Sequence, residues 1–174
     1  MEVKKIKKIL NEIDGPFVVI LIGPPLSGKD TFIRKLDLGE SVKMISRDQI
    51  LLDVYGEDDY DKAFQNVSQK EVDKELDRYL TECSENGDNV IVNMTHMSPK
   101  RRVQNLNYFG SEYYKIAIIF PILDWDEYEK RNAKRKEEES KFIPVKVIKN
   151  MISSYRPIRE DEDFDRVITL DEKW

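Results

Sequence analysis

The sequence of 174 residues contains a single cysteine, Cys83, and a single histidine, His96. A disulfide bond within the chain is therefore impossible, and so is a zinc site built from cysteine and histidine side chains. A chain with so little cysteine suits a reducing compartment, where disulfides do not persist. The two absences exclude a small domain held together by disulfides and a zinc enzyme of the Cys/His type.

Long apolar runs are missing as well. No stretch of about 18 apolar residues occurs, so we expect no membrane-spanning helix. The segment Met1–Ile6 contains no long apolar run before a cleavage site, so we expect no signal peptide. Together with the scarcity of cysteine, these absences favour a cytoplasmic protein with no membrane partner.

Positive charge is in deficit. The chain has 29 lysines and arginines against 34 aspartates and glutamates, which gives a net charge of −5. A general affinity for nucleic acid is therefore not encoded in the total charge, and a nucleic-acid site would have to be a local basic patch. The charged fraction of 36% indicates helices with strongly charged outer faces.

The residues that are present predict one domain over residues 1–174, because the length is ordinary for a domain and 40% of the residues are apolar. We find no internal repeat and no linker. Short apolar runs predict strands, and segments with helical spacing lie between them. The predicted strands are 17–22, 42–45, 89–92, 114–120 and 166–170, and the predicted helices are 3–13, 28–38, one from 48, 60–85, one from 98, 124–139 and 144–155. This alternation predicts an α/β fold with a five-stranded parallel sheet and helices on both faces.

A glycine-containing loop follows the first predicted strand and precedes a helix. Its residues are Gly23, Pro24, Pro25, Leu26, Ser27, Gly28, Lys29, Asp30 and Thr31, which fit the spacing G-x-x-x-x-G-K. Glycine allows the backbone to turn tightly against a phosphate, successive amides form an anion nest, and the helix start adds a positive dipole end. Lys29 adds a point charge for the β and γ phosphates. We therefore predict a site for ATP or another nucleoside triphosphate.

The residue after the lysine departs from the common loop pattern. Asp30 stands where a magnesium-binding serine or threonine is usual, and Thr31 comes one place later. A carboxylate beside a triphosphate is repulsive unless a metal lies between them. Asp30 is therefore either a direct or water-mediated Mg²⁺ ligand or a helix-start residue that points aside, and Thr31 is a second candidate ligand.

From this loop onward the chain resembles the phage-type polynucleotide 5′-hydroxyl kinases, within the P-loop kinase group. The likeness is carried by the loop, by Ser46-Arg47-Asp48, by residues 90–102 ending in Ser98-Pro99-Lys100-Arg101-Arg102, and by R-N-x-x-R at 131–135 followed by P-x-x-V-I-x-x-M at 144–151. The resemblance implies a P-loop kinase fold, an arginine-bearing lid at about 126–145, ATP with Mg²⁺, and a DNA or RNA acceptor.

The resemblance also implies residue roles. The matching aspartate in the family is the general base, so Asp48 is the candidate here, although capping the next helix is an alternative. Arg47 either contacts the acceptor or pairs with a neighbouring acid. Arg131 and Arg135 share a helix face and, with Lys29, would act on the transferred phosphate.

The acceptor half of the pattern is altered. Leu51 stands where phage 5′-kinases carry an arginine for the acceptor phosphate, and Met94-Thr95-His96 replaces D-x-N. Thr95 and His96 are candidate acceptor contacts, although a lone histidine after a strand is often structural. Arg101 and Arg102 either contact acceptor phosphate or form internal ion pairs.

Three functions remain open at this point. The first is a 5′-hydroxyl kinase of DNA or RNA, and the second is a kinase for another hydroxyl, on a modified DNA base, a nucleoside, a nucleotide or a small molecule. The third is a nucleotide-binding module without catalysis. The sequence also leaves a homo-oligomer open.

Overall fold

The computed structural model describes residues 2–139, 141–171 and 173–174. Its five strands form one sheet in the order β2-β3-β1-β4-β5, and every neighbouring pair is parallel. The strands are β1 (Phe17–Ile22), β2 (Val42–Ser46), β3 (Asn89–Asn93), β4 (Tyr114–Ile119) and β5 (Arg166–Thr169). The predicted α/β fold with a five-stranded parallel sheet is confirmed.

The central strand β1 explains why the sheet is covered on both sides. All six of its residues are buried, as the uninterrupted apolar run predicts for a parallel strand. Val18, Ile20 and Ile22 belong to one core cluster, whereas Val19 and Leu21 belong to a second cluster on the other face. This alternation follows from the two-residue period of a strand.

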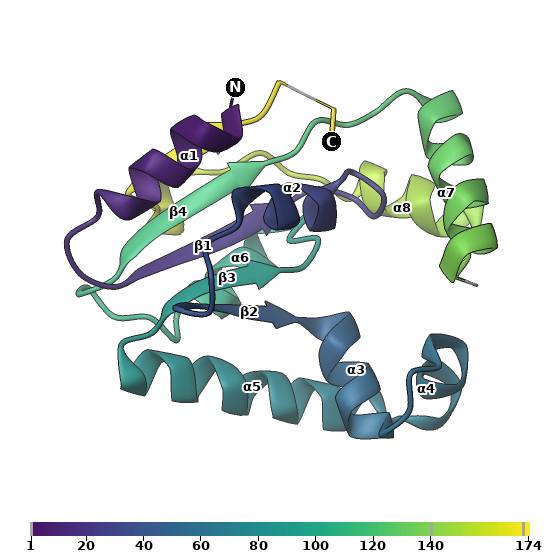
Figure 1. Cartoon of the computed structure of the whole chain (residues 1–174), viewed down its shortest axis with the longest axis horizontal. Helices are drawn as coiled ribbons and strands as arrows, with labels where there is room; N and C mark the ends of the chain where they lie inside the picture. Colours follow the sequence, from purple (N-terminus) through teal and green to yellow (C-terminus); the bar gives the residue numbers. More distant parts are fainter. Residues whose placement is uncertain (1, 140, 172) are drawn as a thin grey trace.

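Helices pack on both faces of the sheet (Figure 1). The second cluster receives side chains from α1 and α2, and the first receives them mainly from α3, α5 and α6. The helices are α1 (Glu2–Asn11), α2 (Lys29–Leu36), α3 (Arg47–Tyr55), α4 (Tyr60–Asn66), α5 (Gln69–Asn86), α6 (Pro99–Leu106), α7 (Trp125–Glu139) and α8 (Val145–Ser153), with a short 3₁₀ turn at Glu160–Glu162. None of the helices in the described ranges combines the length and the apolar character needed to cross a membrane.

The predicted long helix over residues 60–85 is wrong in one respect, because it is two helices. The chain breaks at Val67 and Ser68, where Ser68 caps α5 and Glu71 returns a hydrogen bond to the Ser68 amide at 3.2 Å. This reciprocal capping box is encoded in the spacing S-x-x-E. The break matters because it makes α4 a separate short helix beside α3.

Candidate phosphotransfer site

The loops that follow the parallel strands meet at one edge of the sheet. Strands β1 to β4 point the same way in Figure 1. The loop after β1, the start of α3 after β2 and the segment after β3 therefore lie at the carboxyl ends of parallel strands. Ligands of open α/β sheets bind at this edge. The Gly23 amide donates to the Thr95 carbonyl at 3.0 Å, which joins the loop to the segment after β3.

The phosphate loop needs its second glycine for two reasons. Gly28 has a φ of +96°, which L side chains rarely adopt, and a Cβ there would meet Trp174 atoms at 2.5 Å. Leu26 also has a positive φ, 65°, although it carries a side chain. Backbone strain of this kind is concentrated in ligand-binding loops. Trp174 has no motif around it, so sequence reasoning did not connect it to the loop.

Lys29 is directed into the loop itself. Its Nζ donates to the carbonyl oxygens of Gly23 at 2.9 Å and Pro24 at 2.8 Å, and it lies 3.4 Å from the Ser27 Oγ. Burial lowers the pKa of Lys29 to about 8, against the opposing effect of the Asp30 and Asp48 carboxylates. An anion in the loop would favour the charged form and raise this pKa.

Asp30 points toward the end of β3. Asn93 Nδ2 donates to Asp30 Oδ1 at 2.7 Å, which joins two oxygen-bearing side chains of the kind that Mg²⁺ prefers. The Thr31 hydroxyl accepts from Arg34 at 3.3 Å. No group of three or more His, Cys, Asp or Glu side chains that could hold a metal occurs in the described part of the chain.

Asp48 lies in the first turn of α3 and is exposed. The residue at the N-cap position of α3 is Ser46, so Asp48 does not cap the helix. Asp48 Oδ1 accepts a hydrogen bond from the Tyr60 hydroxyl of α4 at 3.3 Å. Burial raises the pKa of Tyr60 to about 12, and the Asp48 charge adds to the shift, so the hydroxyl stays protonated. Sequence reasoning did not single out Tyr60.

Arg131 and Arg135 of α7 approach this edge from another element. Arg131 donates to Glu127 at 2.6 Å and to the Leu26 carbonyl at 3.0 Å, which ties α7 to the phosphate loop. Arg135 lies one turn further and is partly buried. Its positive charge lowers the pKa values of both Lys29 and Tyr60, so it lies within electrostatic reach of both groups.

The asparagine of the R-N-x-x-R segment has a structural explanation. Asn132 is buried, donates to the Ile143 carbonyl at 2.7 Å and accepts from the Ile143 amide at 3.1 Å. This pair of bonds fixes α7 to the segment that leads into α8. Leu123, Tyr128 and Ile148 form a small core beneath, against which Leu26 of the loop packs.

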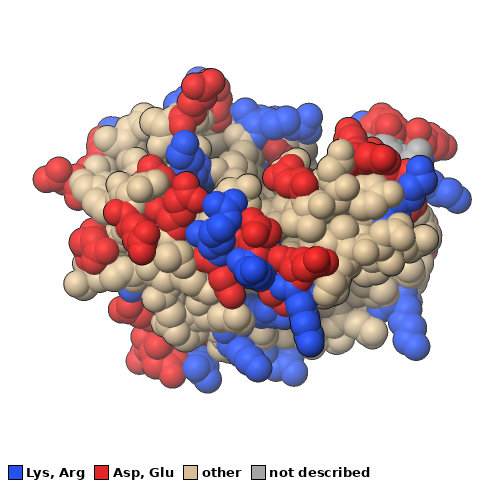
Figure 2. Space-filling view, turned by 90° about the horizontal axis from the view of Figure 1, so that it is seen from below, with Lys and Arg blue, Asp and Glu red and all other residues tan. Residues whose placement is uncertain are grey.

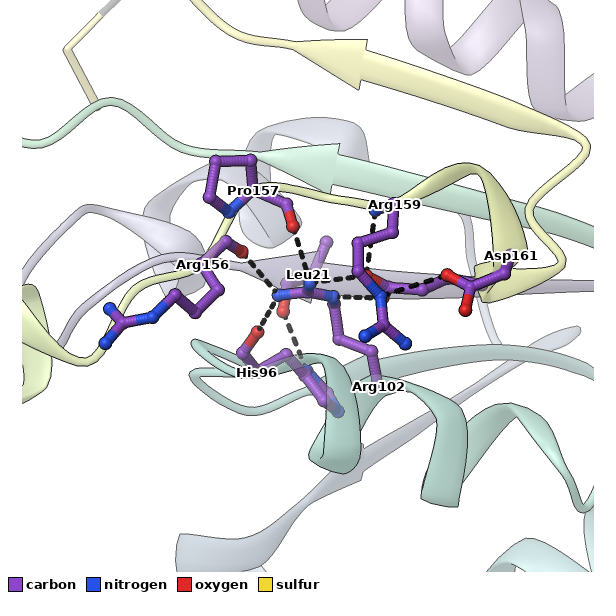
Figure 3. Close-up of polar contacts among 8 residues, drawn as sticks. Leu21, His96, Arg102, Arg156, Pro157, Arg159 and Asp161 are labelled. Atoms are coloured by element: carbon purple, nitrogen blue, oxygen red, sulfur yellow. Dashed lines mark hydrogen bonds and ion pairs between the residues drawn. The ribbon is translucent and has the colours of Figure 1, made fainter.

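Arg102, a candidate for acceptor phosphate, is instead fully buried. Its guanidinium donates twice to Glu162, at 2.5 and 2.7 Å, and to the carbonyls of His96, Arg156 and Pro157 at 3.1 to 3.2 Å (Figure 3). Arginine has five N–H donors, and these five bonds use them all. The internal ion pair is therefore the alternative that holds, and Arg102 has no donor left for a substrate phosphate.

His96 is likewise enclosed in the core, whereas a residue that contacts an acceptor has to be accessible to it. One ring nitrogen lies 2.8 Å from the Leu21 carbonyl, and the other lies 2.7 Å from Asn105 Nδ2. Burial lowers the pKa of His96 to about 4, so the ring is neutral near pH 7. Both nitrogens have partners in the core, which corrects the expectation that His96 contacts the acceptor.

The remaining candidates are placed as follows. Arg47 forms an ion pair with Asp73 of α5 and donates to Gln69 at 2.8 Å, so it pairs with a neighbouring acid. Thr95 is partly buried and contributes its carbonyl to the loop contact described above. Arg101 is exposed on α6. Lys29 thus lies within electrostatic reach of Asp48 and Arg135, whereas Arg47 and Arg102 are each paired with an acidic side chain.

Comparison with known proteins identifies the family to which the chain belongs. The family model described as "AAA domain" matches residues 18–158. No curated protein matches the chain.

Solved structures similar to the chain include several of kinases. A chain of the Pnkp1/Rnl/Hen1 RNA repair complex has a TM-score of 0.66 and 23% identity, and the match covers 83% of this chain and 45% of that one. Kti12 of Chaetomium thermophilum, in complex with ADP-AlF3, has a TM-score of 0.59 and 16% identity, with 88% of each chain covered. Shikimate kinase of Aquifex aeolicus VF5 has a TM-score of 0.55 and 20% identity, with 90% of this chain and 88% of that one covered. At these identities the likeness shows the fold alone, and the chain spans less than half of the RNA-repair chain.

Proposed function

We propose that this chain, which belongs to the AAA-domain family, is an ATP-dependent kinase that phosphorylates the 5′-hydroxyl end of DNA or RNA. Family and fold support a phosphotransferase of the P-loop kinase type, and the acceptor is the proposed part. The observation that carries the proposal is that α7 and the start of α3 meet the phosphate loop at one edge of the sheet: Arg131 donates to the Leu26 carbonyl at 3.0 Å, and Asp48 lies in the first turn after β2. Lys29 of the loop lies within electrostatic reach of both Asp48 and Arg135.

The donor is held by the loop. Its backbone amides and Lys29 bind the β and γ phosphates of ATP, and Arg131 and Arg135 neutralise charge on the transferring group. Asp30 or Thr31 would hold Mg²⁺, which would supply positive charge to the donor phosphates. When the donor binds, the Lys29 Nζ exchanges its bonds to the Gly23 and Pro24 carbonyls for bonds to phosphate oxygens.

The acceptor reacts at Asp48. This carboxylate accepts the proton of the acceptor hydroxyl while the hydroxyl oxygen forms a bond to the γ-phosphorus in line with the breaking bond to ADP. The products are a phosphate ester and ADP, and the proton passes from Asp48 to solvent. The exposure of Asp48 is compatible with a large acceptor such as a polynucleotide end.

The acceptor class rests on two supports. The ordered segments of the sequence resemble polynucleotide 5′-hydroxyl kinases, and a structure similar to this chain belongs to an RNA repair complex. An RNA end is therefore an acceptor to test first, beside the matching DNA end.

A second candidate is a kinase for another hydroxyl compound. It is favoured by Leu51, which is 4% exposed and packs in the core where phage 5′-kinases carry an arginine for acceptor phosphate. Arg102 and His96 are buried too, so three positions expected to shape a polynucleotide site do not face the acceptor.

The deciding experiment is an acceptor screen with γ-labelled ATP and Mg²⁺. We expect label on 5′-hydroxyl RNA or DNA oligonucleotides and no label when the 5′ end already carries a phosphate. Label that persists on the 5′-blocked oligonucleotide would favour modified-base chemistry. Label only on small hydroxyl compounds would favour the second candidate, and ATP binding without transfer to any acceptor would contradict both.

A further inference from the structure

Helix α4 presents two aromatic side chains to the proposed acceptor side. Tyr60 and Phe64 lie one turn apart, and their rings stack with centroids 6.2 Å apart and planes inclined by 21°. Phe64 is 59% exposed, more than any other large apolar residue in the described part of the chain. We call these two residues the aromatic pair. An exposed aromatic ring beside a reactive site is a candidate for ligand contact.

The aromatic pair lies beside Asp48, the proposed general base. The Tyr60 hydroxyl donates to Asp48, and Lys141, which follows the lid helix, has its Nζ 5.3 Å from the Tyr60 ring centroid. Arg135 lies within electrostatic reach of Tyr60. The aromatic surface therefore begins at the carboxylate that receives the proton, and lid cations approach it from one side.

The charge around α4 limits what can bind there. Asp58, Asp59 and Asp61 lie at its start, and Lys62 is paired with Asp59 at 2.9 Å. The face seen from below in Figure 1 mixes acidic and basic side chains and shows no continuous basic surface in that view (Figure 2). Phosphates are therefore repelled from the start of α4 and attracted toward Arg135 and Lys141.

We propose that the aromatic pair is a stacking platform for the nucleobase of the acceptor nucleotide whose hydroxyl is phosphorylated. This inference rests on the proposed function and specifies how the acceptor is recognised. A nucleobase is a neutral, planar group joined to a phosphate chain, so it fits an aromatic surface that has charged groups of both signs at its Tyr60 end and an exposed ring at Phe64. Stacking tolerates any base, which suits an enzyme that acts on ends of varied sequence.

The aromatic pair replaces acceptor contacts that residues buried in the core do not make. Leu51, His96 and Arg102 are buried, so direct contacts to acceptor phosphate from these positions are missing. Stacking on Phe64 supplies affinity without requiring a phosphate contact at any of them.

Phe64→Ala tests the platform, with Phe64→Trp as the variant that keeps a stacking ring and Met44→Ala as a control. Met44 lies on β2, is 43% exposed and is not part of the site. Initial rates are measured on a 5′-hydroxyl oligonucleotide and on the same oligonucleotide with an abasic 5′-terminal residue. We expect Phe64→Ala to raise the KM for the base-bearing acceptor about tenfold and to leave the KM for the abasic acceptor and for ATP unchanged.

The outcomes separate this inference from the proposed function. If oligonucleotides are phosphorylated and Phe64→Ala changes neither KM, the platform is wrong and the proposed function stands. If only free nucleosides are phosphorylated and Phe64→Ala raises their KM, the platform stands and the polynucleotide acceptor is wrong. Phosphorylation of base-free hydroxyl compounds alone would overturn both. Restoration of the wild-type KM by Phe64→Trp, with unchanged thermal unfolding, would support stacking over a folding effect.

Discussion

The donor side and the acceptor side of this edge are built in different ways. On the proposed donor side, Lys29 and Arg131 both donate to backbone carbonyls of the loop. On the acceptor side, Arg102 and His96 lie in the core, whereas Asp48 is exposed. A site formed by backbone groups can be predicted from a short local sequence pattern. A site formed by side chains depends on which of them the fold buries.

The largest effect is expected on the donor side. Lys29→Ala should lower kcat/KM by a factor of between about 10³ and 10⁵, the range that a cation on a transferring phosphoryl group contributes. The rate is measured with labelled ATP, and ATP binding is measured by calorimetry. Lys70→Ala on the exposed surface of α5 is the control. Retention of full ATP affinity by Lys29→Ala would break the assignment of this loop as the donor site.

The next prediction tests whether the donor side and the acceptor side act separately. Asp48→Asn should lower kcat by roughly 10² to 10⁴, the usual contribution of a general base, and should leave the Kd for ATP nearly unchanged. Asp53→Asn is the matched control, because Asp53 is an exposed aspartate of the same helix that accepts a bond from Gln49. Unchanged turnover in Asp48→Asn would remove Asp48 as the base.

A third substitution tests whether Arg102 stabilises the core or contacts the acceptor. Arg102→Met leaves the Glu162 carboxylate buried without its partner, which should lower the free energy of unfolding by about 3–5 kcal/mol. Chemical denaturation measures this difference. Adding Glu162→Leu should recover much of the loss, because the pair is then replaced by apolar groups. A raised acceptor KM with unchanged stability would instead return Arg102 to the acceptor site.

The parts predicted from the sequence share a physical reason. Continuous apolar runs predicted β1, β3 and β4, because buried parallel strands need no polar face, whereas the edge strands β2 and β5 carry shorter apolar runs beside charged residues. Likewise, the loop spacing located the anion nest, because its geometry depends on adjacent residues. The capping box Ser68-x-x-Glu71 was also present in the sequence, so the split between α4 and α5 was predictable from a local signal.

The parts that were missed depend on distant residues. Asn93 bonds to Asp30 across 63 positions, and Arg102 pairs with Glu162 across 60. No period or short motif encodes such contacts, because they are selected by the packing of whole elements. The contact of Trp174 with Gly28 is of the same kind. Two of these contacts involve residues of the loop itself, so the loop spacing predicted the local backbone but not its distant partners.

The smallest effect is expected when the Tyr60 hydroxyl is removed, because Tyr60 has two proposed roles: its hydroxyl bonds to Asp48 and its ring stacks on Phe64. Tyr60→Phe removes the hydrogen bond to Asp48 but keeps the ring that stacks on Phe64. The loss of one hydrogen bond is worth about 1 kcal/mol, so kcat should fall roughly fivefold. The acceptor KM should not change, in contrast to the KM effect expected for Phe64→Ala. Tyr108→Phe is the matched control, because the Tyr108 hydroxyl also donates to an aspartate, Asp77, on the outer helices. A Tyr60→Phe enzyme with unchanged kcat and a raised KM would mean that the hydroxyl binds the acceptor directly, and Asp48 would then be oriented by its helix alone.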